Sequence, residues 1–429
     1  LSPRRRGLRH LPRSAQLTLL LIAAACAPAK PPAPAPTPVV PPAVPPGALA
    51  DTTRAREDSA ARAAAARARR VRAPVRLAFV GDINLGTMTS PGGVPPDSGR
   101  GLLRAAKPFL VGDLVIGNFE GVLADSGETE KCGKRRSVAW TGGAPAETVR
   151  VAPPPHRERR RRHRAKPAPV QCYAFLTPTL LAPRLAEAGF THLNLANNHA
   201  NDFGIDGRRS TEATLAGLGL RTYGPLGDVV IDTVRRGDAS TTVGLIGFTT
   251  YPFSYDLLDI PRSVAVVDSM RPLVDLLVVT FHAGAEGSGA LHLPFAAESL
   301  GHEPRGELRA WAHAVVEAGA DLVVGHGPHV LRGVELWQGR LIAYSLGNFA
   351  TYRGFNLAGP QALTGVLQVE FAPDGARARA QLLPMRQIPL QGPAPDPERA
   401  SARLLRALSD DDFGASAAHV AENGAIGSP

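Results

Sequence analysis

The chain has few cysteines and no long apolar run. Cys26, Cys132 and Cys172 are its three cysteines in 429 residues, which leaves room for one disulfide bond at most. The apolar stretch of residues 17–25 is too short to span a bilayer permanently. A protein that crosses the membrane with many helices is therefore excluded.

The part of the chain expected to fold also lacks a net positive charge, although the whole chain carries +10. Residues 1–74 hold 13 Lys/Arg against 3 Asp/Glu, and residues 131–170 hold 12 against 2, so each segment carries +10. Because these two segments together carry +20, the remainder carries −10. An acidic body gives no support to nucleic-acid binding, and no nucleic-acid partner is expected.

The N-terminus has the pattern of an export signal. Basic residues precede the apolar stretch, and small residues precede Cys26 in Ala23-Ala24-Ala25-Cys26. This resembles the lipobox of bacterial lipoproteins, except that Ala23 stands where Leu is usual. An ordinary signal peptide cleaved near Ala25 is the alternative. We expect residues 1–26 to direct the protein to the bacterial cell envelope as a membrane-anchored lipoprotein, with lipid on Cys26.

Composition divides the rest of the chain. Residues 27–74 form a linker rich in Pro, Ala and Arg, residues 75–390 form the folded domain, and residues 391–429 form a C-terminal tail. A basic insert at residues 133–170 interrupts the domain. We interpret it as a polycationic arm, as a solvated insertion or as an error in the sequence. In an exported protein Cys132 and Cys172 would close this insert with a disulfide bond, and two unpaired thiols are the alternative.

Polar motifs follow five predicted strands. These strands are predicted at residues 75–80, 113–117, 191–195, 276–281 and 321–324. They alternate with helices predicted at 177–189, 206–219 and 307–319. Three closing strands are predicted after them, at 341–345, 365–371 and 381–388. The alternation predicts an α/β sandwich of sheets flanked by helices. In such folds sites form at the carboxyl ends of the strands. The motifs at these ends are Gly81-Asp82, Asn118-Phe119-Glu120, Asn197-Asn198-His199, His282-Ala283-Gly284-Ala285-Glu286 and Gly325-His326-Gly327-Pro328-His329.

The residue types suit a divalent metal and proton transfer. Asp82 and Glu120 offer carboxylates, and His326 and His329 offer two imidazoles in one Gly/Pro turn. Asn118 projects to the same side as Glu120 and is expected to orient a ligand or water. Further along the chain, Asp202 could fix the tautomer of a histidine. Asn348 lies in Ser345-Leu346-Gly347-Asn348-Phe349, where its side chain either forms a hydrogen bond with the site or stabilises a turn.

The ordered set of motifs resembles the CapA, or poly-γ-glutamate capsule-synthesis, family. That family is similar to calcineurin-like metallophosphoesterases, so the resemblance implies a four-layer α/β sandwich with a two-metal site. It implies that His199 is the catalytic proton donor, with Asp202 beside it, and it implies the metal ligands Asp82, Glu120, Asn198, His282, His326 and His329. Five further residues are expected to contact substrate or to support the metal ligands: Asn84, Asn118, Asn197, Glu286 and Asn348.

Two departures from the phosphoesterase pattern concern the second metal. The usual Asp-x-His opening is Asp82-Ile83-Asn84 here, and the usual Gly-His-x-His has gained a residue. We therefore expect one or two divalent ions (Mn, Zn or Fe).

The functional expectation is an exported metal-dependent hydrolase that acts on an anionic cell-surface polymer such as poly-γ-glutamate. The alternatives are a non-catalytic polymer-binding subunit of a capsule synthesis or export complex, and a periplasmic phosphodiesterase.

Overall fold

The computed structural model describes residues 71–131, 135–141 and 173–428. The predicted lipidation site Cys26, the predicted Cys132–Cys172 disulfide and most of the basic insert lie outside these residues. Residues 135–141 of the insert are described, and within them Arg136–Ala139 forms strand β5, which pairs with β4 (Ser126–Thr129). The insert is therefore structured at its beginning, where the sequence predicted a loop.

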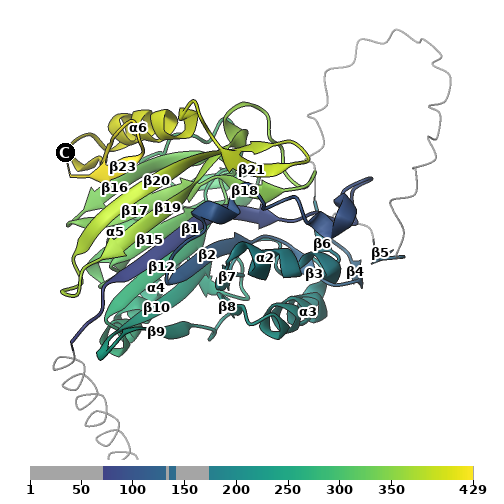
Figure 1. The fold of residues 1–429 in the computed structure, drawn as a ribbon, viewed down its shortest axis with the longest axis horizontal. Helices are drawn as coiled ribbons and strands as arrows, with labels where there is room; N and C mark the ends of the chain where they lie inside the picture. Colours follow the sequence, from purple (N-terminus) through teal and green to yellow (C-terminus); the bar gives the residue numbers. More distant parts are fainter. Residues whose placement is uncertain (1–70, 132–134, 142–172, 429) are drawn as a thin grey trace, which may run out of the picture. The chain divides into compact units, whose positions relative to one another are not determined.

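Two large β-sheets form the body of the protein (Figure 1). The first has the strand order β22-β23-β20-β19-β1-β2-β7-β8, with β18 beside β1 and β21 beside β20. Its strands are β1 (Val75–Asn84), β2 (Leu114–Phe119), β7 (His192–Asn194), β8 (Arg221–Tyr223), β18 (Asn348–Thr351), β19 (Leu363–Phe371), β20 (Arg377–Ile388), β21 (Gly392–Pro395), β22 (His419–Val420) and β23 (Ala425–Gly427).

The second sheet has the order β11-β10-β12-β15-β17-β16, with β9 beside β10. Its strands are β9 (Val230–Arg236), β10 (Ala239–Thr249), β11 (Tyr255–Asp256), β12 (Leu276–His282), β15 (Leu322–His326), β16 (Leu331–Trp337) and β17 (Arg340–Leu346). Short pairs are formed by β3 (Val122–Leu123) with β6 (Leu176–Thr177), by β4 with β5, and by β13 (Glu298–Leu300) with β14 (Glu303–Gly306).

The helices are short. The α-helices are α2 (Pro183–Ala188), α3 (Gly204–Gly217), α4 (Ile260–Met270), α5 (Leu308–Glu317) and α6 (Ala400–Phe413). The 3₁₀ turns are η1 (Pro96–Gly99), η2 (Lys107–Phe109), η3 (Thr179–Leu181), η4 (Arg271–Leu273), η5 (Gly359–Ala362) and η6 (Gly414–Ser416). None of the described helices is long and apolar enough to cross a membrane.

One predicted helix is divided. Residues 177–189 form the end of β6, then η3, then α2. Pro183 lacks a backbone N–H and therefore starts a new helix where a continuous one would need a donor. The helix predicted at 206–219 begins two residues earlier, at Gly204.

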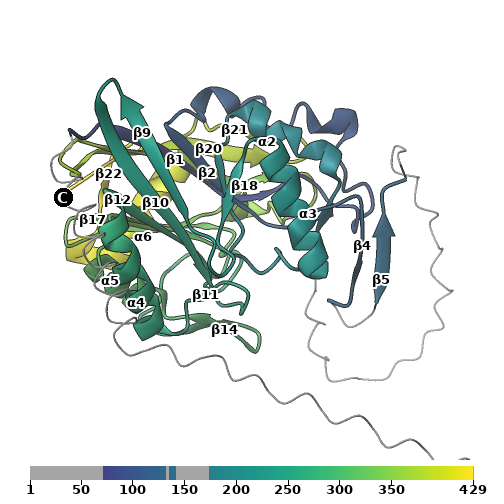
Figure 2. The same cartoon turned by 90° about the horizontal axis from the view of Figure 1, so that it is seen from below.

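The side chains of β1 show how the layers pack. Leu77 and Phe79 point into a central core that also contains Val278 of β12 and Val324 of β15, so the two sheets pack face to face. Ala78 and Val80 point to the other side, into a core shared with α2 and α3. The second sheet has its own outer core against α4 and α5, which Figure 2 shows side by side. The predicted four-layer α/β sandwich is confirmed.

The predicted C-terminal tail is part of the fold. Residues 392–427 form β21, α6, β22 and β23, and three of these four elements extend the first sheet. Leu405 of α6 packs into the central core and Phe413 into the outer core of the second sheet. The sequence predicts one short helix around residues 402–408, and α6 is longer, at Ala400–Phe413.

Strand register brings the polar motifs to one edge. Asp82 on β1 is opposite Asn118 on β2 and Asn348 on β18, and His282 on β12 is opposite His326 on β15. Gly81 makes the close approach to β18 possible, because a Cβ atom there would lie 1.8 Å from the carbonyl oxygen of Gly347. The Asp82 amide donates a hydrogen bond to that same oxygen at 2.9 Å.

Candidate metal centre

Five of the six predicted metal ligands converge between the carboxyl ends of the two sheets. Asp82, Glu120 and His282 are fully buried, and their ligand atoms all lie within 4.8 Å of one another. His326 Nδ1 lies 3.5 Å from Asp82 Oδ1, and His329 Nε2 lies 3.5 Å from Glu120 Oε1. Two strands of each sheet and the turn after β15 supply these groups.

The cluster fits a divalent cation. Within the described part of the chain, neither carboxylate oxygen of Glu120 and neither ring nitrogen of His326 has a hydrogen-bond partner, and the same holds for Nε2 of His282. Buried polar atoms without partners are costly to a fold. Carboxylates together with imidazoles are the donor set that Mn, Fe and Zn accept. A buried Asp-Glu-His group that could bind a metal is therefore present.

The pKa shifts of the cluster also favour a bound cation. Burial raises the pKa of Glu120 well above its usual value, and the charge of Asp82 adds to this shift. Burial would also raise the pKa of Asp82, but contacts with His326 and His329 outweigh it and hold that pKa well below the usual range. Although burial acts to lower it, the pKa of His329 is raised to about 10 by Glu120 and Asp82. A bound cation would supply positive charge that the cluster otherwise obtains by retaining protons.

Asn118 ties the two sheets together at the site. Its Nδ2 donates to Asp82 Oδ1 at 2.8 Å and lies 3.1 Å from Nδ1 of His282. This second contact leaves Nε2 of His282 facing Glu120, 3.8 Å from Oε1. Asn118 Oδ1 in turn accepts hydrogen bonds from Asn194 and Asn197. These contacts suit the orienting role expected of Asn118, whereas Asn194 escaped notice in the sequence because it lies inside a strand.

The other asparagines of the motifs have distinct positions. Asn84 Nδ2 donates to the backbone oxygen of Glu120 at 3.0 Å, so the residue that replaces the usual histidine holds the Glu120 loop. Asn197 Nδ2 donates to the Phe119 carbonyl at 2.8 Å. Oδ1 of Asn198 is buried and has no hydrogen-bond partner among the described residues, which leaves it available as a ligand.

His199 and Asp202 form a buried pair beside the cluster. Nδ1 of His199 lies 2.6 Å from Asp202 Oδ2, and Nε2 lies 3.8 Å from Glu120 Oε1. The amide of Phe175 donates to the same Asp202 oxygen at 2.7 Å, and the Phe175 ring packs on the imidazole. Burial lowers the pKa of His199. The predicted role of Asp202 as the acceptor that fixes this imidazole is supported by the geometry.

Lys131 joins this pair, although the sequence did not single it out. Its Nζ donates to Asp202 Oδ1 and to the backbone oxygen of Asn198, and it lies 3.2 Å from His199 Nδ1. Lys131 precedes the basic insert, so in the sequence it is one of many cations. Its charge offsets the buried carboxylate of Asp202.

The turn after β15 is held from two sides. His329 has a backbone φ of 57°, in the left-handed region, and its Nδ1 lies 2.9 Å from Asn348 Oδ1. Glu286 Oε2 lies 3.9 Å from His329 Nε2, while Glu286 Oε1 accepts from the fully buried Arg305 at 2.9 Å. Asn348 therefore bonds to the site, and Arg305 is a second supporting residue that the sequence did not reveal.

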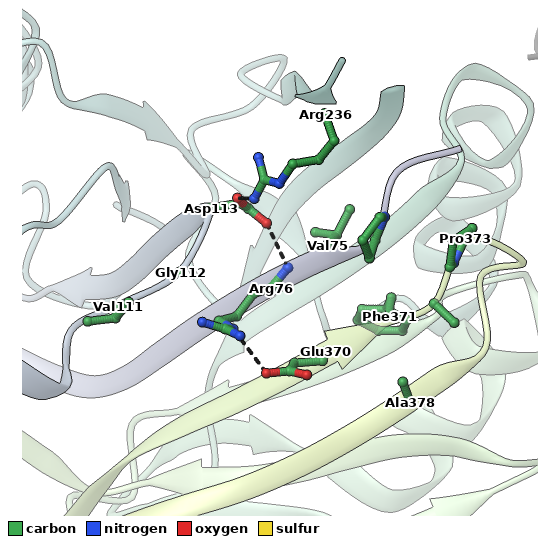
Figure 3. Close-up of a pocket in the computed structure, with 12 residues that line it drawn as sticks. Val75, Arg76, Val111, Gly112, Asp113, Arg236, Glu370, Phe371, Pro373 and Ala378 are labelled. Carbon is green, nitrogen blue, oxygen red and sulfur yellow. Dashed lines mark hydrogen bonds and ion pairs between the residues drawn. The ribbon is translucent and has the colours of Figure 1, made fainter. Parts of the chain in front are cut away.

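A cavity at the far end of β1 has no comparable groups. It measures about 590 Å³ and is lined by Arg76, Asp113, Arg236 and Glu370 (Figure 3). Arg76 pairs with Glu370 at 2.9 Å, and Arg236 pairs with Asp113. These charges neutralise one another, so the strand-end cluster is the stronger candidate site.

Residues 158–353 match the family described as bacterial capsule synthesis protein PGA_cap. The matched range includes His199, His282, His326 and His329 but neither Asp82 nor Glu120, which the fold brings to the same place.

The chain is similar to three named relatives. It is 29% identical over 197 residues to the PGA biosynthesis protein CapA of Bacillus subtilis, covering 42% of this chain and 47% of that protein. It is 32% identical over 193 residues to the capsule biosynthesis protein CapA of Bacillus anthracis, covering 41% and 44%. A probable polyglutamine synthesis accessory protein of Mycobacterium tuberculosis is 27% identical over 224 residues, covering 46% and 54%. The chain thus spans about half the length of these relatives.

Solved structures with partial similarity include a 5'-nucleotidase precursor from Thermus thermophilus, with a TM-score of 0.30 and 14% identity over 54% of this chain and 45% of that one. Another is the anchor protein of the inner membrane complex of Plasmodium, with a TM-score of 0.32 and 10% identity over 72% and 84%.

Proposed function

The chain is a relative of the bacterial capsule synthesis proteins, as its motifs predicted, and from this premise we propose that it is a metal-dependent hydrolase of an anionic cell-surface polymer. The polymer we infer is poly-γ-glutamate or its linkage to the cell wall. The observation that carries the proposal is the His199–Asp202 pair, whose Nε2 lies 3.8 Å from Glu120 Oε1 and faces a buried cluster of carboxylates and imidazoles.

The residues that would hold the metal are Asp82, Glu120, Asn198, His282, His326 and His329. A divalent ion bound there would polarise an oxygen of the substrate and would activate water at neutral pH. The chain's own contribution is to fix these ligands. Asn118 orients Asp82 and His282, and Asn348 orients His329.

His199 is the proton donor to the leaving group. Asp202 accepts from Nδ1, so the proton that is transferred resides on Nε2, on the side of Glu120. Because burial lowers the pKa of His199, its protonated form is a stronger acid than an exposed imidazolium and gives up its proton more readily. Positioned general acids contribute roughly 10²–10⁴ in rate.

The test is a His199→Ala variant assayed for both metal content and turnover. Substrates are poly-γ-glutamate of defined length and a small chromogenic phosphodiester. We expect the variant to retain its metal and to lose turnover by roughly 10²–10⁴. His292→Ala, at an exposed histidine paired with Asp412, is the matched control and keeps wild-type turnover.

Turnover that is unchanged in the His199→Ala variant would overturn the proton-donor role. Wild-type protein that holds metal and binds the polymer but cleaves neither substrate would instead identify a non-catalytic polymer-binding or assembly subunit. Cleavage of the phosphodiester alone would identify a phosphodiesterase.

Action at the cell envelope is part of the same proposal. It rests on the export-signal pattern of residues 1–26 and on Cys26 as the site of lipid attachment. Replacing Cys26 with Ser is expected to release the protein from membranes, and continued membrane association would contradict lipidation.

A further inference from the structure

A basic groove lies along the segment that connects β1 to β2. Two adjoining cavities of about 740 and 210 Å³ share Gly99, Arg100 and Arg104 in their walls. Tyr352 and Asp97 line the larger cavity, and Lys107 and Arg184 line the smaller one. The groove therefore carries Arg100, Arg104 and Lys107 along one wall.

The fold presents these three cations to solvent together. Residues 99–110 make a series of turns closed mainly by hydrogen bonds from the amide of residue i+3 to the carbonyl of residue i, and Leu102, Leu103 and Ala106 are buried in a core that they share with α2. Arg100, Arg104 and Lys107 lie between and beside these buried residues and are all exposed.

The cations of the groove lack acidic partners. Among the described residues, no carboxylate forms an ion pair with Arg100, Arg104 or Lys107, whereas the neighbouring Arg184 is paired with Glu187 at 2.6 Å. Asp97 is the other acidic residue in the wall. By contrast, the two arginines that line the cavity at the far end of β1 are both paired with carboxylates. Unpaired cations in a concave surface attract an anionic ligand.

One loop connects the groove to the metal centre. Thr351 ends β18, whose first residue, Asn348, bonds to His329. The next residue, Tyr352, lines the groove, and three residues later the ring of Phe355 packs on the His329 ring with 4.8 Å between centroids. The loop at residues 352–355 thus supplies one residue to the groove wall and another that contacts the His329 ring.

We propose that this groove binds a segment of a linear polycarboxylate chain while a neighbouring segment lies at the metal centre. The identity of the polymer rests on the proposed function above. Guanidinium groups bind carboxylates through two parallel hydrogen bonds, and a repeating carboxylate chain can engage several cations at once. Each contact is weak, but contacts on one chain reinforce each other.

The experiment measures binding of the full chain to labelled poly-γ-glutamate by fluorescence anisotropy in about 150 mM salt, where distant charges are screened. The test variant is Arg100→Glu/Arg104→Glu/Lys107→Glu. The matched control is Arg235→Glu/Arg262→Glu/Arg379→Glu, which makes the same change in net charge at exposed residues outside the groove.

We expect the groove variant to bind the polymer about tenfold or more weakly than the control variant, because it converts attraction into repulsion at three neighbouring positions. Its metal content and its turnover of the small phosphodiester stay at wild-type values. Equal weakening in both variants would show that only overall charge matters, and this result or wild-type affinity in the groove variant would overturn the proposal.

The same measurements distinguish failure of the hydrolase assignment from failure of the groove proposal. If wild type hydrolyses neither substrate but the groove variant still loses polymer affinity, the groove stands and the hydrolase assignment fails. If wild type cleaves the polymer and the groove variant cleaves it with an unchanged KM, the hydrolase assignment stands and the groove fails.

Discussion

Nδ1 of the His199 imidazole donates a hydrogen bond to Asp202 Oδ2 over 2.6 Å, at the edge of a buried cluster of metal-binding groups. Asp202 receives two further hydrogen bonds, from the amide of Phe175 and from Lys131. A carboxylate held by three donors has a fixed orientation, and it imposes that orientation on the histidine.

Lys131 is therefore expected to matter for turnover and not for metal binding. Lys131→Met removes the cation that holds Asp202 Oδ1, so we expect turnover to fall roughly 10–100-fold with metal content unchanged. Lys131→Arg, which keeps the charge, recovers part of the loss. Steady-state kinetics and metal analysis on both variants check this, with Arg135→Met as control, because Arg135 pairs with the exposed Glu128. Full turnover in Lys131→Met would show that Lys131 has no positioning role.

Metal binding is expected to release protons. His329, with a pKa of about 10, retains a proton at pH 7 when no cation is bound and must lose it to act as a ligand, and burial raises the pKa of Glu120, which acts in the same direction. Metal affinity should therefore rise with pH, by about tenfold per pH unit for each proton released. Calorimetric titration in buffers of different ionisation enthalpy counts the protons, and Glu120→Gln should release fewer and bind more weakly. Binding with no net proton release would show that these pKa shifts are absent.

His192, at the other end of the first sheet, is expected to make stability depend on pH. Burial lowers its pKa from 6.5 to about 4 in the folded protein. Below pH 6.5 the unfolded chain binds a proton that the folded protein does not bind. The contribution of His192 to the free energy of unfolding is therefore complete above pH 6.5 and is lost as the pH falls toward 4. The expected loss of unfolding free energy is about 1–3 kcal/mol, since a tenfold difference in proton affinity between the folded and unfolded states corresponds to about 1.4 kcal/mol.

Chemical denaturation of wild type and His192→Gln at pH 7 and pH 4.5 measures this effect. The variant should lose less stability than wild type between the two values. His292→Gln, at an exposed position, should lose as much as wild type. An identical loss in His192→Gln and wild type would exclude His192 as a source of the pH dependence.

The sequence placed the strand-end residues of the candidate site together for a physical reason. His282 and His326 each end an apolar strand, and Asp82 lies two residues before the end of β1. Parallel strands of an α/β sheet bring their carboxyl ends to one edge. Their meeting across two different sheets depends on the face-to-face packing, which the family resemblance implied and strand patterns alone did not.

The supporting residues could not be predicted in the same way. Lys131 and Arg305 lie in irregular or short segments without periodicity, and a single cation in such a segment has no local signal that ties it to a distant carboxylate. Asn194 looked like an ordinary strand residue, because its hydrogen bond to Asn118 depends on the pairing of β2 with β7. The sequence predicts a short C-terminal helix around residues 402–408, and its full length, Ala400–Phe413, was not predicted because Pro/Ala-rich composition resembles a linker.

The central claim is that the buried cluster holds a divalent metal, and metal content by plasma mass spectrometry tests it most directly. The comparison is between the purified full chain and its His326→Ala/His329→Ala variant, each after reconstitution with manganese, zinc or iron. We predict one or two tightly bound ions per wild-type chain and their loss in the variant. Wild-type protein that remains metal-free under all three conditions would contradict the claim.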